Sequence, residues 1–194
     1  RLHVGHYVGS LKERVKLHMF LLRGMPFIDL AHLRKRDMQD GRITYSRHKT
    51  DKPITVRIPR EALVLIAKYA DRHSASPYLF PILDARIRDG WQSYRNYQDA
   101  LRHFNRKLGQ VMSRLLPGVR VSSYTARHTW ATLAFHSGQP VGIISQALGH
   151  SSLRVTETYL KPFGNELVDK ANRQLIASVR KCKWKNETEY RAGL

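Results

Sequence analysis

The sequence contains only one cysteine, Cys182, in 194 residues. A single cysteine cannot form an internal disulfide, which indicates a reducing compartment. Long apolar runs are absent too: none approaches the roughly 20 residues that a membrane-spanning helix requires, and no signal-peptide pattern opens the chain. We therefore expect a cytoplasmic protein without a membrane partner.

Acidic residues are scarce relative to basic ones. The chain has 15 Asp and Glu against 34 Lys and Arg, which gives a formal net charge of +19. Such an excess raises the affinity for polyanions, because each phosphate contact releases counterions. Nucleic acid is the expected partner, although a ribosome-associated or membrane-surface protein would have a similar charge.

Two further absences bear on cofactors. The ten histidines do not combine with spaced acids or cysteines into a metal-ligand motif. The sequence also lacks a glycine-rich loop of the kind that cradles the phosphates of ATP. We therefore expect a protein that works without a metal, a nucleotide or another cofactor.

The residues that are present predict a mainly α-helical domain with a small antiparallel β-hairpin or sheet, an α+β fold. The length and the apolar fraction of 42% suffice for one sizeable core. Apolar spacing, caps and helix breakers predict helices over these ranges: 11–23, 27–33, 60–73, 94–115, 125–138, 141–148, 152–159 and 164–179. For the helix that begins at 125, Ser123 or Thr125 is the expected cap.

The hairpin is predicted by alternation of apolar and polar residues. Residues 43–48 alternate, and a second strand-like run covers Ile54–Ile58 after a turn that contains proline. The tip region carries Arg47, Lys49 and Lys52, a cationic cluster. We expect Arg47 and Lys52 to contact the DNA backbone.

The segment 94–115 has the clearest helical periodicity. Its apolar positions recur at alternating steps of three and four residues: Tyr94, Tyr97, Leu101, Phe104, Leu108, Val111 and Leu115. We expect this apolar seam to pack in the core. The arginines off the seam fit a solvated face and a DNA-facing one equally well.

Three residues in the C-terminal half suit one kind of chemistry. Arg127 can grip a phosphate through a planar fork of donors, His150 can donate or pass a proton near neutral pH, and the Tyr159 hydroxyl can attack phosphorus. Short segments predicted to be helical separate them. The expected chemistry is phosphoryl transfer on nucleic acid.

The motifs around these residues resemble the catalytic domain of the tyrosine recombinase (phage integrase) family. Tyr124-Thr-Ala-Arg127-His-Thr, Leu148-Gly-His150 and Tyr159 nine residues further on resemble its C-terminal half. The segments that resemble its upstream half are Arg23-Gly-Met-Pro-Phe-Ile-Asp29 and Arg47-His-Lys49-Thr50. The resemblance extends from about Leu11 to Leu160 and implies the fold shared by tyrosine recombinases and type IB topoisomerases.

The resemblance implies a role for each residue. Arg23 and Arg127 would stabilise the negative charge that develops on the non-bridging oxygens of the phosphodiester. Tyr159 would be the nucleophile; a free phenol has a pKa near 10, and positive charge from Arg23, Arg127 and His150 would favour its phenolate. His150 would also donate a hydrogen bond to a non-bridging oxygen.

Two supporting roles follow from the upstream motifs. Lys49 would protonate the leaving 5′ oxygen, and Lys52 is the alternative if the turn has a different register. Asp29 would orient a neighbouring group by hydrogen bonding, or would cap a helix.

The chain departs from the family pattern at Tyr124, where the family usually has histidine. A neutral tyrosine can hydrogen-bond the phosphate but is a poorer proton acceptor, so its role as a base or as an orienting donor stays open. We expect His128, next to Arg127, to face elsewhere on the helix and to be structural.

The function that the resemblance implies is site-specific DNA recombination or integration in a mobile element, through a 3′-phosphotyrosyl intermediate and without metal or ATP. The partners would be double-stranded DNA and other copies of the chain, as a tetramer on paired sites, with accessory DNA-bending proteins also compatible. The expected location is a bacterial cytoplasm, with the nucleoid. The alternatives are a type IB topoisomerase-like enzyme that nicks and rejoins one strand, and a DNA-binding module without catalysis.

The same resemblance divides the chain. We expect a linker remnant at 1–10, a catalytic domain at 11–162, a C-terminal helix at 163–180 that could dock on a neighbouring subunit, and a basic mobile tail at 181–194. An N-terminal DNA-binding region is expected to be absent from this sequence.

Overall fold

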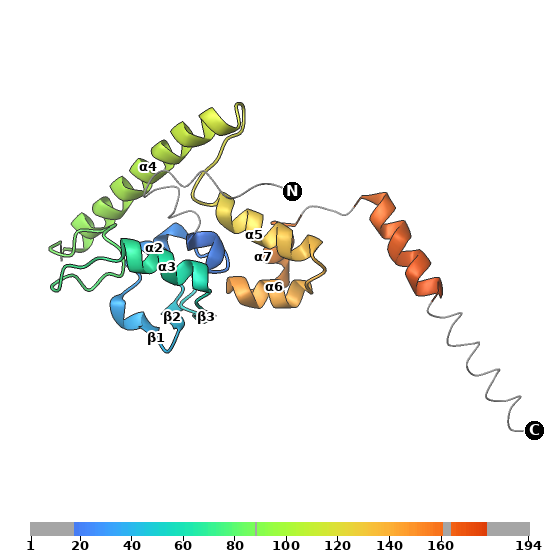
Figure 1. The fold of residues 1–194 in the computed structure, drawn as a ribbon, viewed down its shortest axis with the longest axis horizontal. Coiled ribbons are helices and arrows are strands. Elements are labelled where there is room, and N and C mark those ends of the chain that lie inside the picture. Colours follow the sequence, from blue (N-terminus) through green and yellow to red (C-terminus); the bar gives the residue numbers. More distant parts are fainter. Residues whose placement is uncertain (1–17, 88, 161–163, 178–194) are drawn as a thin grey trace, which may run out of the picture. The chain divides into compact units, whose positions relative to one another are not determined.

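The computed structural model describes residues 18–87, 89–160 and 164–177. The chain divides into two compact units, residues 1–160 and 161–194 (Figure 1). The linker expected at 1–10, most of the helix expected from residue 11, Cys182 and the tail expected at 181–194 lie outside the described residues.

The first unit is mainly helical and contains one small sheet. Residues 18–21 are helical. The elements that follow are α2 (Phe27–His32), the 3-10 helix η1 (Lys35–Asp37), β1 (Met38–Gln39), β2 (Arg42–Ser46), β3 (Pro53–Arg57), α3 (Arg60–Tyr69), α4 (Gly90–Leu115), α5 (Thr125–His136), α6 (Val141–Leu148) and α7 (Leu153–Glu157). This arrangement confirms the predicted α+β class.

The predicted hairpin is present and gains a third strand. β2 and β3 pair antiparallel with Ile43 opposite Val56 and Tyr45 opposite Ile54. These four side chains are buried, while the residues between them are exposed, because successive side chains of a strand point to opposite faces. The short strand β1, which the sequence did not predict, pairs with the other edge of β2.

The long helix α4 is present, but its apolar seam is only partly buried. Phe104 and Leu108 are its buried residues, and the Phe104 ring stacks on Phe27 of α2 with centroids 4.7 Å apart. Tyr94 and Leu115 at the two ends are 54% and 51% exposed. The expectation that the whole seam packs in the core was therefore wrong, because the neighbouring elements cover only its central part.

The helices α5 and α6 form a second small core from Ala131, Ile144 and Leu148, and Tyr159 and Leu160, which follow α7, pack against it. The helix α6 ends as predicted at Gly149, whose φ of 63° lies in the left-handed region. A Cβ at Gly149 would lie 2.5 Å from the Ile54 side chain and 2.8 Å from that of Arg47. This glycine lets the hairpin approach the turn between α6 and α7.

The predicted cap of α5 was wrong. The N-cap residue is Tyr124, and its side chain makes no capping hydrogen bond. Thr125 Oγ1 instead accepts a hydrogen bond from the backbone N–H of Ser122 at 3.0 Å. The Tyr124 side chain is therefore left to make other contacts.

In the second unit, residues 165–177 are helical and every described residue is exposed. No helix in the described ranges combines the length and the apolar character that crossing a bilayer would require.

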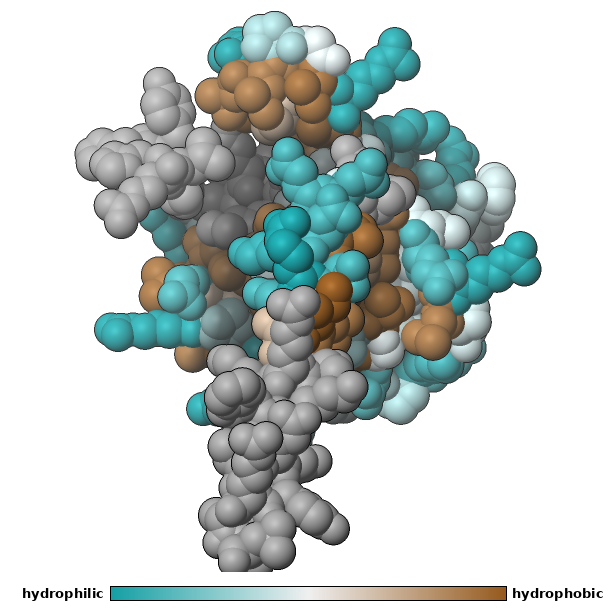
Figure 2. All heavy atoms as spheres, turned by 90° about the vertical axis from the view of Figure 1, so that its right-hand side faces the viewer, coloured by the Kyte–Doolittle hydropathy of each residue, from teal (hydrophilic) through white to brown (hydrophobic). Residues whose placement is uncertain are grey.

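On the face that Figure 2 presents, hydrophilic side chains lie among hydrophobic ones.

Candidate active site

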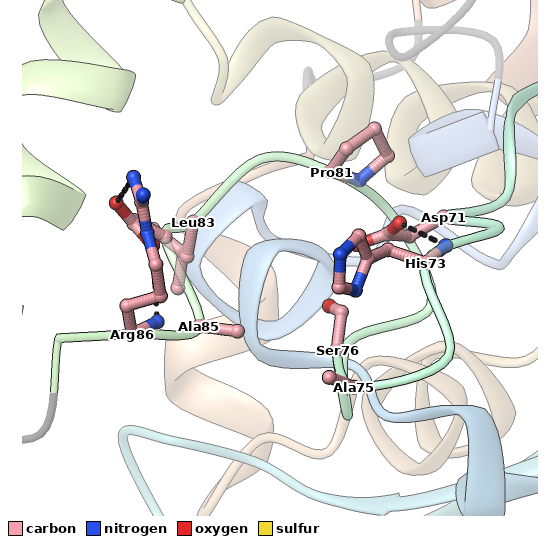
Figure 3. Close-up of a pocket in the computed structure, with 9 residues that line it drawn as sticks. Asp71, His73, Ala75, Ser76, Pro81, Leu83, Ala85 and Arg86 are labelled. Atoms are coloured by element: carbon pink, nitrogen blue, oxygen red, sulfur yellow. Dashed lines mark hydrogen bonds and ion pairs between the residues drawn. The ribbon is translucent and has the colours of Figure 1, made fainter.

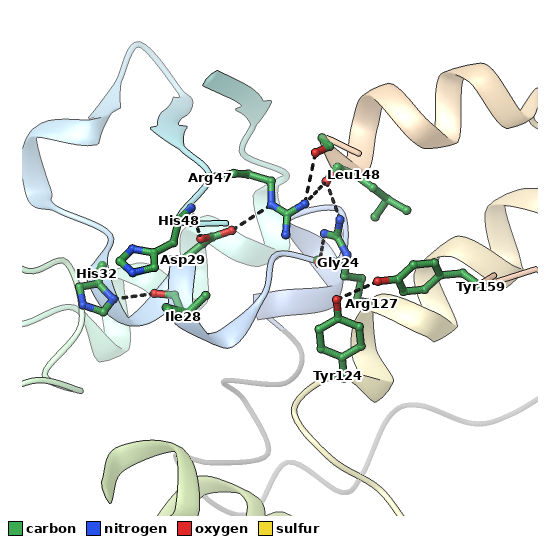
Figure 4. Close-up of polar contacts among 11 residues, drawn as sticks. Gly24, Ile28, Asp29, His32, Arg47, His48, Tyr124, Arg127, Leu148 and Tyr159 are labelled. Atoms are coloured by element: carbon green, nitrogen blue, oxygen red, sulfur yellow. Dashed lines mark hydrogen bonds and ion pairs between the residues drawn. The ribbon is translucent and has the colours of Figure 1, made fainter. Parts of the chain in front are cut away.

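Arg127 lies at the centre of the candidate site, on the first turn of α5, and is 1% exposed. Its Nη1 donates to the Gly24 carbonyl at 3.0 Å, and its Nη2 donates to the Leu148 carbonyl (Figure 4). Its Nε is buried without a hydrogen-bond partner among the described residues. Burial, and to a lesser extent the positive charge of Arg47, lowers the pKa of Arg127, so the site would favour an anion.

Arg23 and Gly24 form the turn that ends the helix of residues 18–21. Both have positive φ, 60° and 67°. A Cβ at residue 24 would lie 3.1 Å from Arg127 Cα, so glycine permits the close approach of this turn to α5. Arg23 is partly exposed, and its Nη1 is 3.5 Å from the Thr55 carbonyl oxygen of β3.

Arg47 is buried and does not lie on the surface, where a DNA contact would require it. It is 4% exposed, its Nε pairs with Asp29 Oδ2 at 3.4 Å, and its Nη1 donates to the carbonyls of Leu148 and Gly149 at 3.1 and 3.2 Å. Asp29 Oδ1 also accepts from the backbone N–H of His48 at 2.9 Å. The expected DNA contact is corrected: Arg47 joins the hairpin to α2 and to the turn after α6.

The two lysines of the hairpin tip differ in their surroundings. Lys52 Nζ donates to the His150 carbonyl at 3.0 Å. Lys49 is exposed in the turn formed by residues 48–50. The side chain of Lys52 is thus held by protein, whereas that of Lys49 faces solvent beside the site.

His150 follows the turn at Gly149 and is 7% exposed. Its Nδ1 is 2.8 Å from Thr156 Oγ1, and its Nε2 is buried without a hydrogen-bond partner in the described part of the chain. Burial, together with the positive charges of Arg127, Arg47 and Lys49, lowers its pKa to about 4. The expected positive charge of His150 is therefore corrected, because this imidazole is neutral at pH 7 in the DNA-free chain.

Tyr159 lies just after α7, and its hydroxyl is 2.8 Å from the hydroxyl of Tyr124 (Figure 4). Its ring stacks on that of His150 with centroids 5.0 Å apart. Burial first, and Tyr124 second, raises the pKa of Tyr159, while Arg127 acts in the opposite direction. Tyr159 is therefore protonated at neutral pH in this state.

His128 contacts Tyr159, which the sequence did not predict. The two ring centroids are 4.5 Å apart, and the His128 and Tyr124 rings lie 5.5 Å apart edge to face. The spacing could have indicated that His128 lies beside Tyr124, because residues four apart share one face of a helix. His128 lies beside the site and does not face elsewhere.

The sequence matches a family of known proteins over most of its length. Residues 7–166, most of the chain, match the model of the phage integrase family. The chain belongs to the phage integrase family.

Relatives of this integrase-family chain include archaeal recombinases. Tyrosine recombinase XerA of Pyrococcus furiosus is 27% identical over 169 residues, which cover 84% of this chain and 56% of that protein. Tyrosine recombinase XerA of Thermococcus onnurineus is 30% identical over 155 residues, which cover 77% of this chain and 51% of that protein. The chain thus spans about half the length of the curated relatives that it matches.

Solved structures share the fold of this integrase-family chain. A crystal structure of XerA recombinase has a TM-score of 0.57 at 18% identity and covers 90% of this chain and 65% of that one. The Tn1549 transposon integrase in complex with a circular intermediate DNA has a TM-score of 0.56 at 14% identity, with 84% and 59% covered. The predicted fold, a tyrosine recombinase catalytic domain, is confirmed.

A cavity of about 640 Å³ in this integrase-family chain lies apart from these residues. It is lined by segment 71–86, including Asp71, His73, Ser76 and Arg86 (Figure 3). The residues that we expect to carry the chemistry do not line it. The candidate site is therefore a junction of loops and helix ends around Arg127 and not this cavity.

The structural role of Arg47 can be tested through its ion pair with Asp29. We expect Arg47→Met or Asp29→Asn alone to lower the free energy of unfolding by about 3–5 kcal/mol, because each leaves a buried charged group without its partner. The free energy of unfolding of the double variant should fall by less than the sum of the two single decreases. Urea unfolding of the wild type, the two single variants and the double variant measures this coupling.

Arg57→Met is the matched control, because Arg57 is an exposed arginine of the same hairpin. It should leave the free energy of unfolding within about 0.5 kcal/mol. An Arg47→Met chain of unchanged stability and weakened DNA binding would contradict the structural role and restore the DNA contact.

Proposed function

We propose that the chain cleaves and rejoins double-stranded DNA by transesterification through Tyr159, as a site-specific recombinase. The observation that carries this proposal is the placement of the Tyr159 hydroxyl beside a buried arginine and a buried histidine. Each of these two has one ring or guanidinium nitrogen that finds no partner among the residues that the structure describes. Membership of the phage integrase family supports it. Similarity over 84% and 77% of the chain to two archaeal tyrosine recombinases supports it as well.

Arg127 and Arg23 would bind the scissile phosphate. Attack on phosphorus places extra negative charge on the non-bridging oxygens, and donors already fixed in position stabilise that charge without reorganising. The buried Nε of Arg127 is one such donor. The strained turn at Arg23 and Gly24 would bring a second guanidinium to the same phosphate.

His150 would act as a neutral hydrogen-bond donor. If the Thr156 hydroxyl donates to Nδ1, the neutral ring carries its proton on Nε2, the nitrogen without a partner in the described residues. That N–H would donate to a non-bridging oxygen. A neutral imidazole can do this without adding a further positive charge beside Arg127 and Arg47.

Lys49 would protonate the leaving 5′ oxygen. An alkoxide is a poor leaving group, and an exposed lysine in a turn can reach a strand that lies over the site. The other lysine, Lys52, is bonded to the His150 carbonyl and is the weaker candidate. Reversal of these steps with a second strand's 5′ hydroxyl would give a recombined strand, and the phosphotyrosyl bond would conserve the energy needed for rejoining.

The test is capture of the covalent intermediate. A pool of 5′-labelled duplexes with a randomised tract and a nick opposite it is incubated with the chain and run on a denaturing gel. We expect labelled DNA bound to protein through its 3′ end, and the modified peptide should contain Tyr159. Recombined product between two copies of a selected duplex supports recombination, relaxation of supercoils alone would indicate a topoisomerase-like enzyme, and binding without an adduct would indicate a non-catalytic module.

The second unit suggests how copies of the chain assemble. Its helix carries Leu167, Val168, Leu175 and Ile176, which are 45–65% exposed and share one side at helical spacing. Burying such an apolar face is favourable. We expect it to pack against the first unit of a neighbouring copy in a tetramer on paired sites. The unit boundaries at 160 and 161 fit this division.

We expect Leu167→Ser with Leu175→Ser to weaken assembly on DNA by about tenfold or more in sedimentation velocity, because two apolar contacts are lost. Binding of one copy to DNA should not change. The control is Asn172→Ser with Gln174→Ser, which alters polar residues of the same helix. Unchanged assembly of the leucine variant would remove the basis of this docking proposal.

The chain would act in the compartment that holds its DNA. A cytoplasmic location is proposed from the single cysteine and the net charge of +19. The relatives come from Pyrococcus and Thermococcus, which are archaea, so the cell type need not be bacterial.

A further inference from the structure

The hydrogen bond between Tyr124 and Tyr159 links the nucleophile to solvent. The two hydroxyl oxygens are 2.8 Å apart, and the hydroxyl groups point toward each other (Figure 4). Tyr159 is partly buried, whereas Tyr124 is 41% exposed. One neighbour of the reacting oxygen therefore has access to water.

The nucleophile must lose a proton when its oxygen bonds to phosphorus, and the other groups around it accept a proton poorly. Arg127 is a donor only. His150 has one ring nitrogen at Thr156, and burial beside Arg127 lowers its pKa to about 4, so its protonated form is disfavoured. His128 contacts the Tyr159 ring through its own ring. The Tyr124 oxygen lies 2.8 Å from the reacting hydroxyl and, unlike the Arg127 guanidinium that also contacts this hydroxyl, it can accept a proton.

We propose that the proton of Tyr159 leaves through the Tyr124 hydroxyl to a solvent water molecule, an inference that rests on the proposed function. As the Tyr159 oxygen bonds to phosphorus, its O–H bond breaks and the proton passes to the Tyr124 oxygen. The Tyr124 hydroxyl proton passes to water in the same step. The bond from phosphorus to the 5′ oxygen breaks, and that oxygen takes a proton from Lys49.

This route differs from a histidine base because Tyr124 holds no extra proton at any stage. It returns to the neutral phenol at the end of each transfer, and the pathway runs in reverse when the 5′ hydroxyl attacks the phosphotyrosine. The Tyr124 oxygen is therefore catalytic in both cleavage and rejoining.

The test uses a duplex selected by adduct formation, and a second version with sulfur in place of the 5′ bridging oxygen. A thiolate leaves without a proton, so the sulfur duplex removes the need for Lys49 but not the need to deprotonate Tyr159. We expect Tyr124→Phe to slow cleavage of both duplexes by about 100-fold, a usual size for lost proton transfer. Lys49→Met should be slow on the normal duplex and close to wild type on the sulfur duplex.

A second variant reports on the proton itself. Tyr124→His supplies an acceptor with an ordinary pKa of about 6.5, so it should recover most of the wild-type rate at pH 8. Its rate relative to wild type should fall as the pH drops below 6.5, because a protonated imidazole accepts no proton. Tyr94→Phe, an exposed tyrosine of α4, is the control and should match wild type.

The outcomes separate the two proposals. Wild-type cleavage by Tyr124→Phe, recovery of Tyr124→Phe on the sulfur duplex, or a Tyr124→His to wild-type ratio that does not change with pH would each overturn the proton route and leave the recombinase proposal standing. Absence of any adduct from the wild-type chain would overturn the proposed function and the proton route with it. Melting curves and DNA binding of each variant are measured in parallel, so a folding defect is not read as slow chemistry.

Discussion

Replacing Tyr159 with phenylalanine is expected to abolish the covalent protein–DNA adduct. The phenol oxygen is the only atom that the substitution removes, and it is the atom that would bond to phosphorus. The ring contacts with His150 and His128 involve the face that phenylalanine retains. We therefore expect no detectable adduct on the denaturing gel, at any enzyme concentration that gives full DNA binding.

The same substitution should leave the fold and DNA binding nearly unchanged. It removes the hydrogen bond to the Tyr124 hydroxyl, which can bond to water instead, and the contact with Arg127, which keeps its bonds to the Gly24 and Leu148 carbonyls. The free energy of unfolding should therefore fall by at most about 1 kcal/mol. Tyr78→Phe, a substitution of a half-buried tyrosine away from the site, is the matched control and should form the adduct normally. An adduct that persists in Tyr159→Phe would assign the nucleophile to another residue.

Local sequence patterns predicted most of the helices and strands. The β2–β3 pairing, the glycine at the end of α6 and the length of α4 follow from alternation, helix breakers and apolar periodicity. The two-residue strand β1 has too few residues to show a pattern. The burial of α4 could not be predicted, because it depends on which other elements reach its two ends.

The position of Arg47 could have been predicted from alternation but not from its charge. Alternation along the hairpin places residue 47 on the same face as Ile43 and Tyr45, which is the buried face. Its positive charge suggested DNA instead. The acid that allows its burial, Asp29, is 18 residues away and lies beside it only in the folded chain.

Long-range contacts also decided the state of the site residues. His150 is neutral because the chain buries it close to Arg127 and Arg47, neither of which is near it in sequence. Tyr124 and Tyr159 are 35 residues apart, so no spacing rule connects their hydroxyls. The order of the motifs predicted which residues belong to the site. Their protonation states and hydrogen-bond partners depend on contacts that form only in the folded chain.

Arg127→Lys is the second substitution with a large expected effect. Lysine keeps the charge but replaces a planar fork with a single ammonium, which cannot reach the Gly24 and Leu148 carbonyls and a phosphate at once. We expect the cleavage rate to fall by about 1,000-fold, the upper range for removal of one donor that stabilises a developing oxyanion. The free energy of unfolding should also fall, by about 1–3 kcal/mol, because a buried carbonyl loses its donor.

A chemical change in the DNA separates these two effects of Arg127→Lys. A neutral methylphosphonate at the scissile position has one non-bridging oxygen fewer, so less negative charge develops and the arginine has less to stabilise. The rate ratio of wild type to Arg127→Lys should therefore shrink on the methylphosphonate duplex, when both proteins are assayed well below their melting temperatures. The exposed Arg114→Lys on α4 should show a ratio near one on both duplexes. If the ratio for Arg127→Lys is the same on both, Arg127 acts by holding the turns at Gly24 and Leu148 together, and charge stabilisation at the phosphate belongs to another residue.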